Sequence, residues 1–231
     1  METRARLISV IVPTLDEEST LAATLARARA ERAAVELIVV DGGSRDATVA
    51  VARAHADRVL EAARGRAAQM NAGAAAACGD VLLFLHADTG LPSGWATDVN
   101  GALAAPDVVG GRFDLRLDAR GVAFRLTERL INLRSRLSGV ATGDQAIFVR
   151  REVFERLGGY PALPLMEDIA FCRALKRVGR LRALRVVVTT SARRWQRHGL
   201  VRTVLLMWGL RAAYYAGVSP ARLARLYRDA R

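Results

Sequence analysis

The sequence predicts an α/β fold in which helices flank a mostly parallel central sheet, with a helical extension at the C-terminal end. Strand-like and helix-like segments alternate through the first 90 residues, as they do where parallel strands are joined by helices. Five consecutive apolar residues at 81–85 indicate a strand buried on both faces. The length of 231 residues suits one large domain of this kind. Ligands are therefore expected at the carboxyl edge of the sheet.

The first half of the chain is predicted to contain four parallel strands with helices between them. The helix after the first strand should run to about residue 32, with Ser19 or Thr20 as its cap. No glycine triplet of the dinucleotide-binding type follows the first strand, so the usual NAD fingerprint is absent. The expected strands are 7–12, 35–40, 58–60 and 81–85, and the later helices are about 45–56 and 65–78.

The second half is less regular. Glycines at 158 and 159 predict the end of a short helix. The expected helices are 92–103, 122–137, 151–157 and 166–177. The expected strands are a strand pair or bulged strand at 108–117, then 146–149 and 180–190, followed by a polar loop at 191–198.

Charge is the unusual feature of the composition. The formal net charge is +12, and Lys176 is the single lysine, so the positive charge is almost entirely arginine. From Lys176 onward there are fourteen basic residues and one acidic residue, Asp229. This asymmetry indicates an anionic partner surface. A membrane is favoured over nucleic acid because helix-turn-helix, zinc-finger and RNP signals are absent.

The two cysteines and the N-terminal segment indicate a cytoplasmic protein. Cys78 and Cys172 lie far apart and without metal-type spacing, so both are expected to be reduced core residues. The first residues show no signal-peptide pattern, and no window of about eighteen residues lacks charge. Peripheral attachment at the inner face of the cell membrane is an open alternative.

Two potential ligands follow the apolar strand at 81–85. If the chain stays extended, His86 and Asp88 share a face at the carboxyl end of that strand. A carboxylate and an imidazole there could hold a divalent cation that neutralises a pyrophosphate. Alternatively, Asp88 caps the next turn and His86 is a surface residue.

Seven short motifs in this order resemble the inverting family 2 glycosyltransferases of GT-A fold. The resemblance covers nearly the whole chain and is closest to a compact bacterial subgroup associated with selenoproteins or arsenosugars. It implies transfer of a sugar from a nucleoside-diphosphate donor, with UDP favoured, to a hydroxyl acceptor, assisted by Mg²⁺ or Mn²⁺. The motifs are 10–17, 39–44, Gly65-Arg66 with Asn71, His86-Ala87-Asp88, Gly143-Asp144-Gln145, Glu167-Asp168 and Arg194-Trp195.

The resemblance implies a donor site in which the carboxylate of Asp41 accepts the N–H of the nucleotide base. From the residues alone, Asp41 could equally begin a tight turn, Glu17 could be a first-turn helix acid, and Arg66 could be solvated. The implied donor-binding residues are Pro13, Thr14, Glu17, Asp41, Arg66, Asn71 and Arg194.

The metal site is implied at the family's DXD position, with Asp88, His86 and His198 as candidate ligands. Because His86 stands where an acid is common, the metal preference is open. A surface position is the alternative for His198.

Asp168 is the implied catalytic base, which would take the proton of the acceptor hydroxyl during inversion. Glu167 or Asp144 would assist or shape the acceptor pocket, although Glu167 and Asp168 could simply begin a helix. Gln145 and Trp195 are the candidate acceptor residues, with core packing as the alternative for Trp195.

The segment 200–218 is apolar but contains Arg202 and Arg211 on opposite helix faces. It could pack on the core, which is the default, or dimerise, or lie on an anionic membrane with a lipid-linked acceptor. Ser191 replaces the glutamine of the motif found in processive relatives, and no membrane helix accompanies it, so polymerisation is not expected.

We therefore predict a single-domain glycosyltransferase. Its nucleotide-binding half would span 1–90, its acceptor and catalytic half 91–198, and its arginine-rich helical extension 199–231. The alternatives are a non-catalytic nucleotide-sugar binding protein at a membrane surface and a nucleotidyltransferase of similar fold. A nucleotidyltransferase would need a glycine-rich basic loop after the first strand, and 13–17 is not one.

Overall fold

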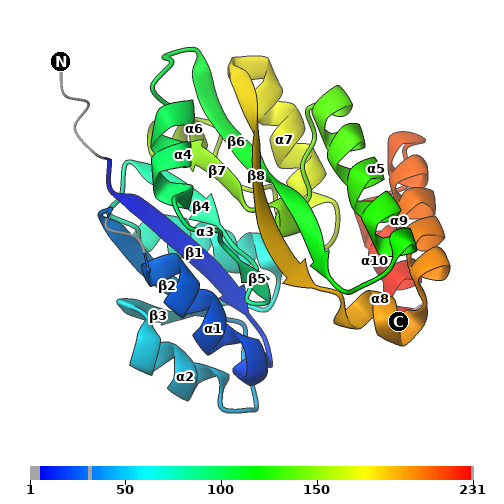
Figure 1. Cartoon of the computed structure of the whole chain (residues 1–231), viewed down its shortest axis with the longest axis horizontal. Coiled ribbons are helices and arrows are strands. Elements are labelled where there is room, and N and C mark those ends of the chain that lie inside the picture. Colours follow the sequence, from blue (N-terminus) through cyan, green and yellow to red (C-terminus); the bar gives the residue numbers. More distant parts are fainter. Residues whose placement is uncertain (1–5, 31–32, 230–231) are drawn as a thin grey trace.

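The computed structural model describes residues 6–30 and 33–229 and contains one eight-stranded sheet between layers of helices (Figure 1). The strand order is β3-β2-β1-β4-β7-β6-β8-β5. Strands β1 to β4 are parallel, whereas β7 runs antiparallel to both β4 and β6, and β6 is parallel to β8. The strands are β1 (Ile8–Thr14), β2 (Val35–Asp41), β3 (Arg58–Glu61), β4 (Val81–Phe84), β5 (Thr89–Gly90), β6 (Val108–Asp118), β7 (Ile147–Arg150) and β8 (Arg180–Ser191).

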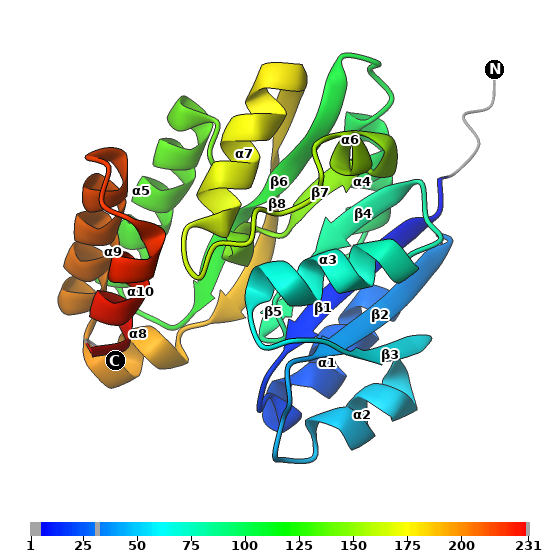
Figure 2. The same ribbon diagram turned by 180° about the vertical axis from the view of Figure 1, so that it is seen from behind.

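Helices cover both faces of this sheet, and three of them gather at the end of the molecule away from α1 and α2 (Figure 2). The three are α5 (Val122–Ser138), α9 (Leu200–Tyr215) and α10 (Pro220–Asp229). The other helices are α1 (Glu18–Arg29), α2 (Thr48–His55), α3 (Arg66–Ala76), α4 (Trp95–Ala102), α6 (Arg151–Arg156), α7 (Glu167–Val178) and α8 (Arg193–His198), with a 3₁₀ turn, η1, at Gly143–Gln145.

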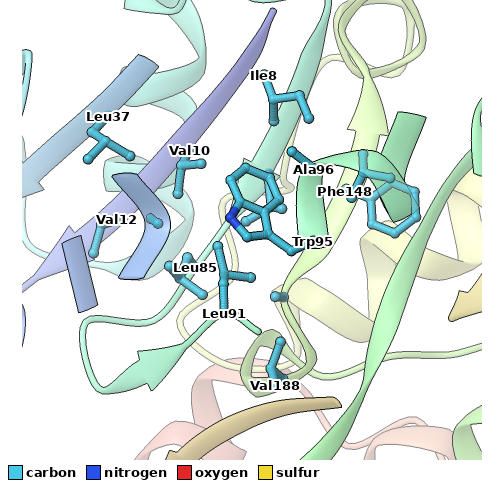
Figure 3. Close-up of a cluster of buried hydrophobic side chains, with 14 of the residues drawn as sticks. Ile8, Val10, Val12, Leu37, Leu85, Leu91, Trp95, Ala96, Phe148 and Val188 are labelled. Atoms are coloured by element: carbon cyan, nitrogen blue, oxygen red, sulfur yellow. The ribbon is translucent and has the colours of Figure 1, made fainter. Parts of the chain in front are cut away.

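Alternate residues of the central strands enter two separate cores. In β4, Val81 and Leu83 pack into one core, while Leu82 and Phe84 pack into the other. The first core surrounds Trp95, which is fully buried (Figure 3). Because successive side chains of a strand point to opposite faces, the continuous apolar runs of the sequence are those of strands covered on both sides.

The carboxyl ends of β1 and β2 are joined by a buried side chain of α3. The side-chain amide of Gln69 donates from Nε2 to the carbonyl oxygen of Thr14 at 2.8 Å and to that of Val40 at 2.9 Å. Gly42 passes directly over this amide, and a Cβ on Gly42 would lie 3.0 Å from Nε2. These contacts fix the edge of the sheet at which ligands were expected.

Most expected elements are present, with boundaries shifted by a few residues. The bulged strand expected at 108–117 is confirmed, since β6 has register shifts where it pairs with β8. The predicted termination at Gly158 is also confirmed, because α6 ends just before it and Gly158 has a φ of +75°. The segment 200–218 packs its inner face into the second core, as the default predicted, through residues such as Leu206 and Leu210.

Four local expectations are wrong. The loop expected at 191–198 contains α8, which brings a helix up to the site. The N-cap of α1 is Glu17 rather than Ser19 or Thr20, and position 32 lies outside the described residues. Cys172 is buried as predicted, but Cys78 is exposed, since it follows the end of α3.

The fourth correction concerns the chain after β4. Residues 86–89 form a turn closed by the N–H of Thr89 donating to the carbonyl of His86 at 3.0 Å. The extended geometry from which a shared face was inferred for His86 and Asp88 is therefore absent.

We expect Gln69→Met to destabilise the protein by about 1–3 kcal/mol, because the buried carbonyl oxygens of Thr14 and Val40 would each lose a hydrogen bond from Nε2. Urea unfolding followed by circular dichroism measures this change. Ala75→Met is the matched control, because it places the same side chain at an exposed position of α3 and should change stability by less than about 0.5 kcal/mol. Equal stability of the two variants would contradict the assigned role of Gln69.

Candidate active site

A small pocket lies where β1, β4, α3 and α7 meet. Its polar lining comes from Arg66, His86, Glu167 and Asp168, four residues that the sequence had singled out. Its remaining lining is Pro13, Met70, Phe84, Leu85, Gly143 and Tyr160. The structure therefore assembles a cation, an imidazole and two carboxylates from distant parts of the chain over an apolar floor.

The two acids are positioned by the first turn of α7 and by η1. Oδ2 of Asp168 accepts the backbone N–H of Gly143 at 3.0 Å, and Oδ1 accepts the N–H of Ile169 at 2.7 Å. Glu167 is only 5% exposed, whereas Asp168 is partly exposed. Asp168 is thus the acid of the pair that a substrate can reach more easily.

Gly143 also lies against His86. A Cβ at position 143 would lie 2.5 Å from Nε2 of His86, which is too close for any real side chain. The glycine therefore allows η1 to approach the imidazole while its N–H holds Asp168.

Burial dominates the protonation of this pocket. It raises the pKa of Glu167 from the ordinary value of 4.5 to about 7, with a further contribution from the negative charge of Asp168, while Arg66 opposes the rise. Burial also raises the pKa of Asp168, against the two backbone hydrogen bonds. Carboxyl groups whose pKa values are raised toward the working pH are suited to acid–base chemistry.

The imidazole of His86 is neutral at neutral pH. Burial lowers its pKa well below 6.5, and the charges of Arg66 and Arg194 lower it further. A neutral imidazole has a free lone pair, as a metal ligand requires.

Backbone strain concentrates around these residues. Within the described ranges, the non-glycine residues with positive φ are Asp16 (+55°), Ala146 (+47°) and Met166 (+69°). Asp16 precedes Glu17, Ala146 follows η1, and Met166 precedes the acid pair. Each such residue costs about 1–3 kcal/mol and persists where surrounding contacts impose it, often at functional sites.

Asp88 belongs to a second cluster beside the pocket. Nη2 of Arg193 lies 2.8 Å from Oε2 of Glu17 and 3.9 Å from Oδ2 of Asp88. Burial and the charge of Glu17 raise the pKa of Asp88, while Arg193 and Arg194 lower it. The arginine therefore bridges two acids, one that follows β1 and one that follows β4.

The predicted base-recognition residue, Asp41, is engaged within the protein. Its carboxylate accepts the N–H groups of Gly43 and Ser44, each at 2.8 Å, and also the hydroxyl groups of Ser44 and Thr14. Burial alone would raise its pKa, but these hydrogen bonds outweigh burial and lower it. The turn interpretation is thus realised, and contact with a base stays a prediction.

Two other predicted site residues, Asn71 and Gln145, form hydrogen bonds that hold nearby backbone segments in place. The side-chain amide of Asn71 exchanges hydrogen bonds of 2.8 and 2.9 Å with the backbone of Tyr160. Gln145 is fully buried and bonded to Thr142 and Phe113, so it braces η1, and its contact with an acceptor stays a prediction. Contact of Asn71 with the donor remains a prediction.

The candidate metal ligands do not form a protein-only metal centre. Across residues 6–30 and 33–229 there is no group of three or more His, Cys, Asp or Glu that could hold a metal ion. His198 and Trp195 lie half-buried on α8, while the charge of Arg194 acts on both His86 and Asp88. One or two protein ligands suit a cation that takes its other ligands from phosphate and water.

Sequence reasoning missed the bridging role of Arg193 and the burial of Arg134. Nε and Nη2 of Arg134 are buried without a hydrogen-bond partner, as is Oδ1 of Asp144. Burial, with repulsion from Arg211, lowers the pKa of Arg134 to about 10, while Asp144 and Asp168 raise it. Nothing in the spacing of α5 distinguished this arginine from its exposed neighbours.

The mostly parallel sheet flanked by helices, with an acid pair at the start of α7 that faces a pocket at the carboxyl ends of β1 and β4, is typical of the GT-A class of fold. The family profile described as "Glycosyl transferase family 2" matches residues 9–158. The chain therefore belongs to glycosyl transferase family 2.

Two curated relatives are similar over most of the same region. An "Undecaprenyl-phosphate 4-deoxy-4-formamido-L-arabinose transferase" of Pseudomonas paraeruginosa is 33% identical over 158 residues, which cover 62% of this chain and 46% of the relative. A "PGL/p-HBAD biosynthesis glycosyltransferase" of Mycobacterium bovis is 34% identical over 173 residues, covering 68% of this chain and 64% of the relative. The chain thus spans about half to two thirds of the length of these relatives.

Solved structures support the fold. A mannosyltransferase of Pyrobaculum calidifontis, in complex with GDP-Man and Mn²⁺, superposes with a TM-score of 0.69 at 21% identity, covering 96% of this chain and 69% of the other. Glucosyl-3-phosphoglycerate synthase of Mycobacterium tuberculosis, with Mn²⁺, UDP and glucosyl-3-phosphoglycerate, gives 0.58 at 24% identity, covering 79% and 70%.

We expect Glu167→Gln to flatten the dependence of stability on pH. Because the pKa of Glu167 is raised to about 7 in the folded state, stability should fall as pH rises from about 4.5 to 7, as the unfolded chain releases this proton first. At 1.36 kcal/mol per pKa unit, wild type should lose about 2.5 kcal/mol relative to the variant between about pH 5 and 8.5.

Urea unfolding at both pH values measures this difference. Glu155→Gln is the control, since that side chain is exposed and 64% accessible. Parallel pH dependence in wild type and Glu167→Gln would show that Glu167 does not titrate as a buried acid.

Proposed function

We propose that this chain transfers a glycosyl group, with inversion, from a nucleoside-diphosphate sugar, preferably a UDP-sugar, to a hydroxyl acceptor. The observation that supports this most directly is the pocket in which Asp168, held by the N–H of Gly143, faces the same space as His86 and Arg66. Family membership favours transfer over the two alternatives, a non-catalytic binding protein and a nucleotidyltransferase.

In the proposed reaction Asp168 accepts the proton of the acceptor hydroxyl while that oxygen attacks the anomeric carbon. The bond between this carbon and the diphosphate oxygen breaks on the opposite face, so the configuration inverts. The bond from Gly143 orients Oδ2 of Asp168, and the neighbouring Glu167, with its pKa of about 7, helps to hold the transferred proton. Asp144, whose Oδ1 lacks a partner, is placed to adjust the acceptor side.

The leaving diphosphate requires positive charge. Arg66, at the first turn of α3, presents its guanidinium together with the positive end of that helix. Arg193 and Arg194 of α8 add charge from the other side. Asp88 and the neutral His86 would hold Mg²⁺ or Mn²⁺, which would neutralise the diphosphate as it leaves. The carboxylate oxygen of Asp88 suits these hard cations, which complete their coordination with phosphate and water.

The proposed acceptor is presented at a membrane by a lipid carrier. One relative's name refers to undecaprenyl phosphate, which supports an acceptor of this kind. Trp195 on α8 is the proposed acceptor-binding residue.

Asp88→Ala should abolish metal-dependent donor binding, because the carboxylate that holds the cation is lost. Calorimetry against UDP-, GDP- and dTDP-sugars, with Mn²⁺, Mg²⁺ or EDTA, measures binding and identifies the donor. Asp118→Ala, at an exposed position, should behave as wild type. Absence of any metal-dependent donor binding by the wild-type protein would contradict the proposed metal-assisted donor site.

Asp168→Asn should preserve donor binding but lower turnover by about 10²–10⁴-fold, since amides do not accept the hydroxyl proton. Release of nucleoside diphosphate measures turnover, either with the identified acceptor or with water. The exposed Asp80→Asn is the matched control. Unchanged turnover in Asp168→Asn would remove this residue from the role of base.

A further inference from the structure

The outer surfaces of α5 and α9 carry most of the exposed apolar side chains of the molecule. In the described part of the chain, nine of the twelve large apolar residues that are exposed lie on these two helices. On α5 they recur at helical spacing, from Val122 at 85% exposure to Leu137 at 79%. The nine, named here the α5–α9 apolar face, are Val122, Leu126, Leu130, Leu133, Leu137, Val201, Leu205, Trp208 and Tyr215.

These residues form a face and not a scatter of exposed positions. Helices α5 and α9 lie side by side in both views of the molecule (Figures 1 and 2). Their inner sides are already occupied: α5 is bonded to β6 through Glu128 and Asn132, and α9 packs Leu210 into the second core. Contiguous exposed apolar surface on this scale marks an interaction site.

The charged residues on the same surfaces indicate the chemistry of the partner. Arg129 on α5 and Arg202 on α9 lie exposed among the apolar residues. The single acid in the two helices, Glu128, is 7% exposed and is bonded to Arg125 and to the N–H of Leu117. The face is therefore apolar and cationic, without exposed negative charge.

We propose that the α5–α9 apolar face docks on the surface of an anionic lipid bilayer. Leucine and valine would enter the boundary between headgroups and acyl chains, and arginine would pair with lipid phosphates. Trp208 and Tyr215, exposed by 51% and 56%, suit this boundary because their rings are apolar and their tips polar. Among the described residues no helix is long and apolar enough to span a bilayer, so the contact is peripheral.

A second copy of the chain fits this face less well than a bilayer does. A two-fold interface would bring equivalent surfaces together, so Arg129 and Arg202 would approach cationic surfaces of the partner copy. Like charges placed together in an interface are costly, and a chain with a net charge of +12 repels its copies at long range as well.

Flotation of the purified protein with vesicles tests this proposal independently of any transferase activity. One set of vesicles contains phosphatidylcholine alone, and the other contains about one third phosphatidylglycerol. We expect binding to the anionic vesicles, weakened by salt, and little binding to the neutral ones.

Two double variants and matched controls assign the binding to the face. Leu126→Gln with Leu205→Gln removes one apolar residue from each helix and should weaken partitioning by about tenfold or more. Val178→Gln with Val187→Gln changes exposed apolar residues elsewhere, at 39% and 37% exposure, and should leave it unchanged. Arg129→Gln with Arg202→Gln should weaken binding to anionic vesicles by about tenfold or more, whereas Arg53→Gln with Arg116→Gln should not.

Failure of wild type to float with anionic vesicles would overturn the proposal, as would binding that survives Leu126→Gln with Leu205→Gln. A stable dimer that this same variant dissociates would assign the face to a second copy instead. Because vesicle binding and donor binding are separate measurements, either proposal can fail without the other.

Discussion

The amide of Gln69 is the contact on which the geometry of the candidate site most depends. It donates to the carbonyl groups of Thr14 and Val40 at the ends of two parallel strands, in addition to the N–H of Gly42 on Thr14 and the hydroxyl of Thr14 on Val40. The next turn is closed by Asp41, whose carboxylate collects the N–H groups of Gly43 and Ser44. With both strand ends fixed, Arg66 at the start of the same helix as Gln69 is held beside the pocket.

The rest of the site is attached to this edge through β4 and β7. Their antiparallel pairing places η1, which precedes β7, next to His86, which follows β4. The N–H of Gly143 then holds Asp168, and the acid pair is buried at the start of α7. The strained backbone at Ala146 and Met166 persists because the contacts of this network stabilise it. The strain thus accompanies a preorganised pair of acids.

Much of this arrangement could be predicted from the sequence because it follows from periodicity. Apolar runs predicted the covered strands, and the motifs that carry the family resemblance included Arg66, His86, Glu167 and Asp168, which line one pocket. The wrong predictions concern segments whose structure depends on tertiary contacts. Residues 191–198 are polar and were expected to be a loop, whereas tertiary contacts stabilise α8, including the ion pair from Arg193 to Glu17 about 176 positions away. Such pairing, like the burial of Arg134, forms between segments that are far apart in the sequence. No local sequence pattern therefore predicts it.

The arginines of this chain have two different roles, which depend on where they lie in the fold. Around the pocket, Arg66 opposes the rise of the pKa of Glu167 to about 7, while Arg193 and Arg194 oppose the rise of the pKa of Asp88. On α5 and α9, Arg129 and Arg202 lie exposed among apolar residues, and the one acid of the two helices, Glu128, is buried. The same residue type therefore shifts the pKa of acids in one place and adds exposed positive charge to an apolar surface in the other. A net charge of +12 includes both contributions, and only the fold separates them.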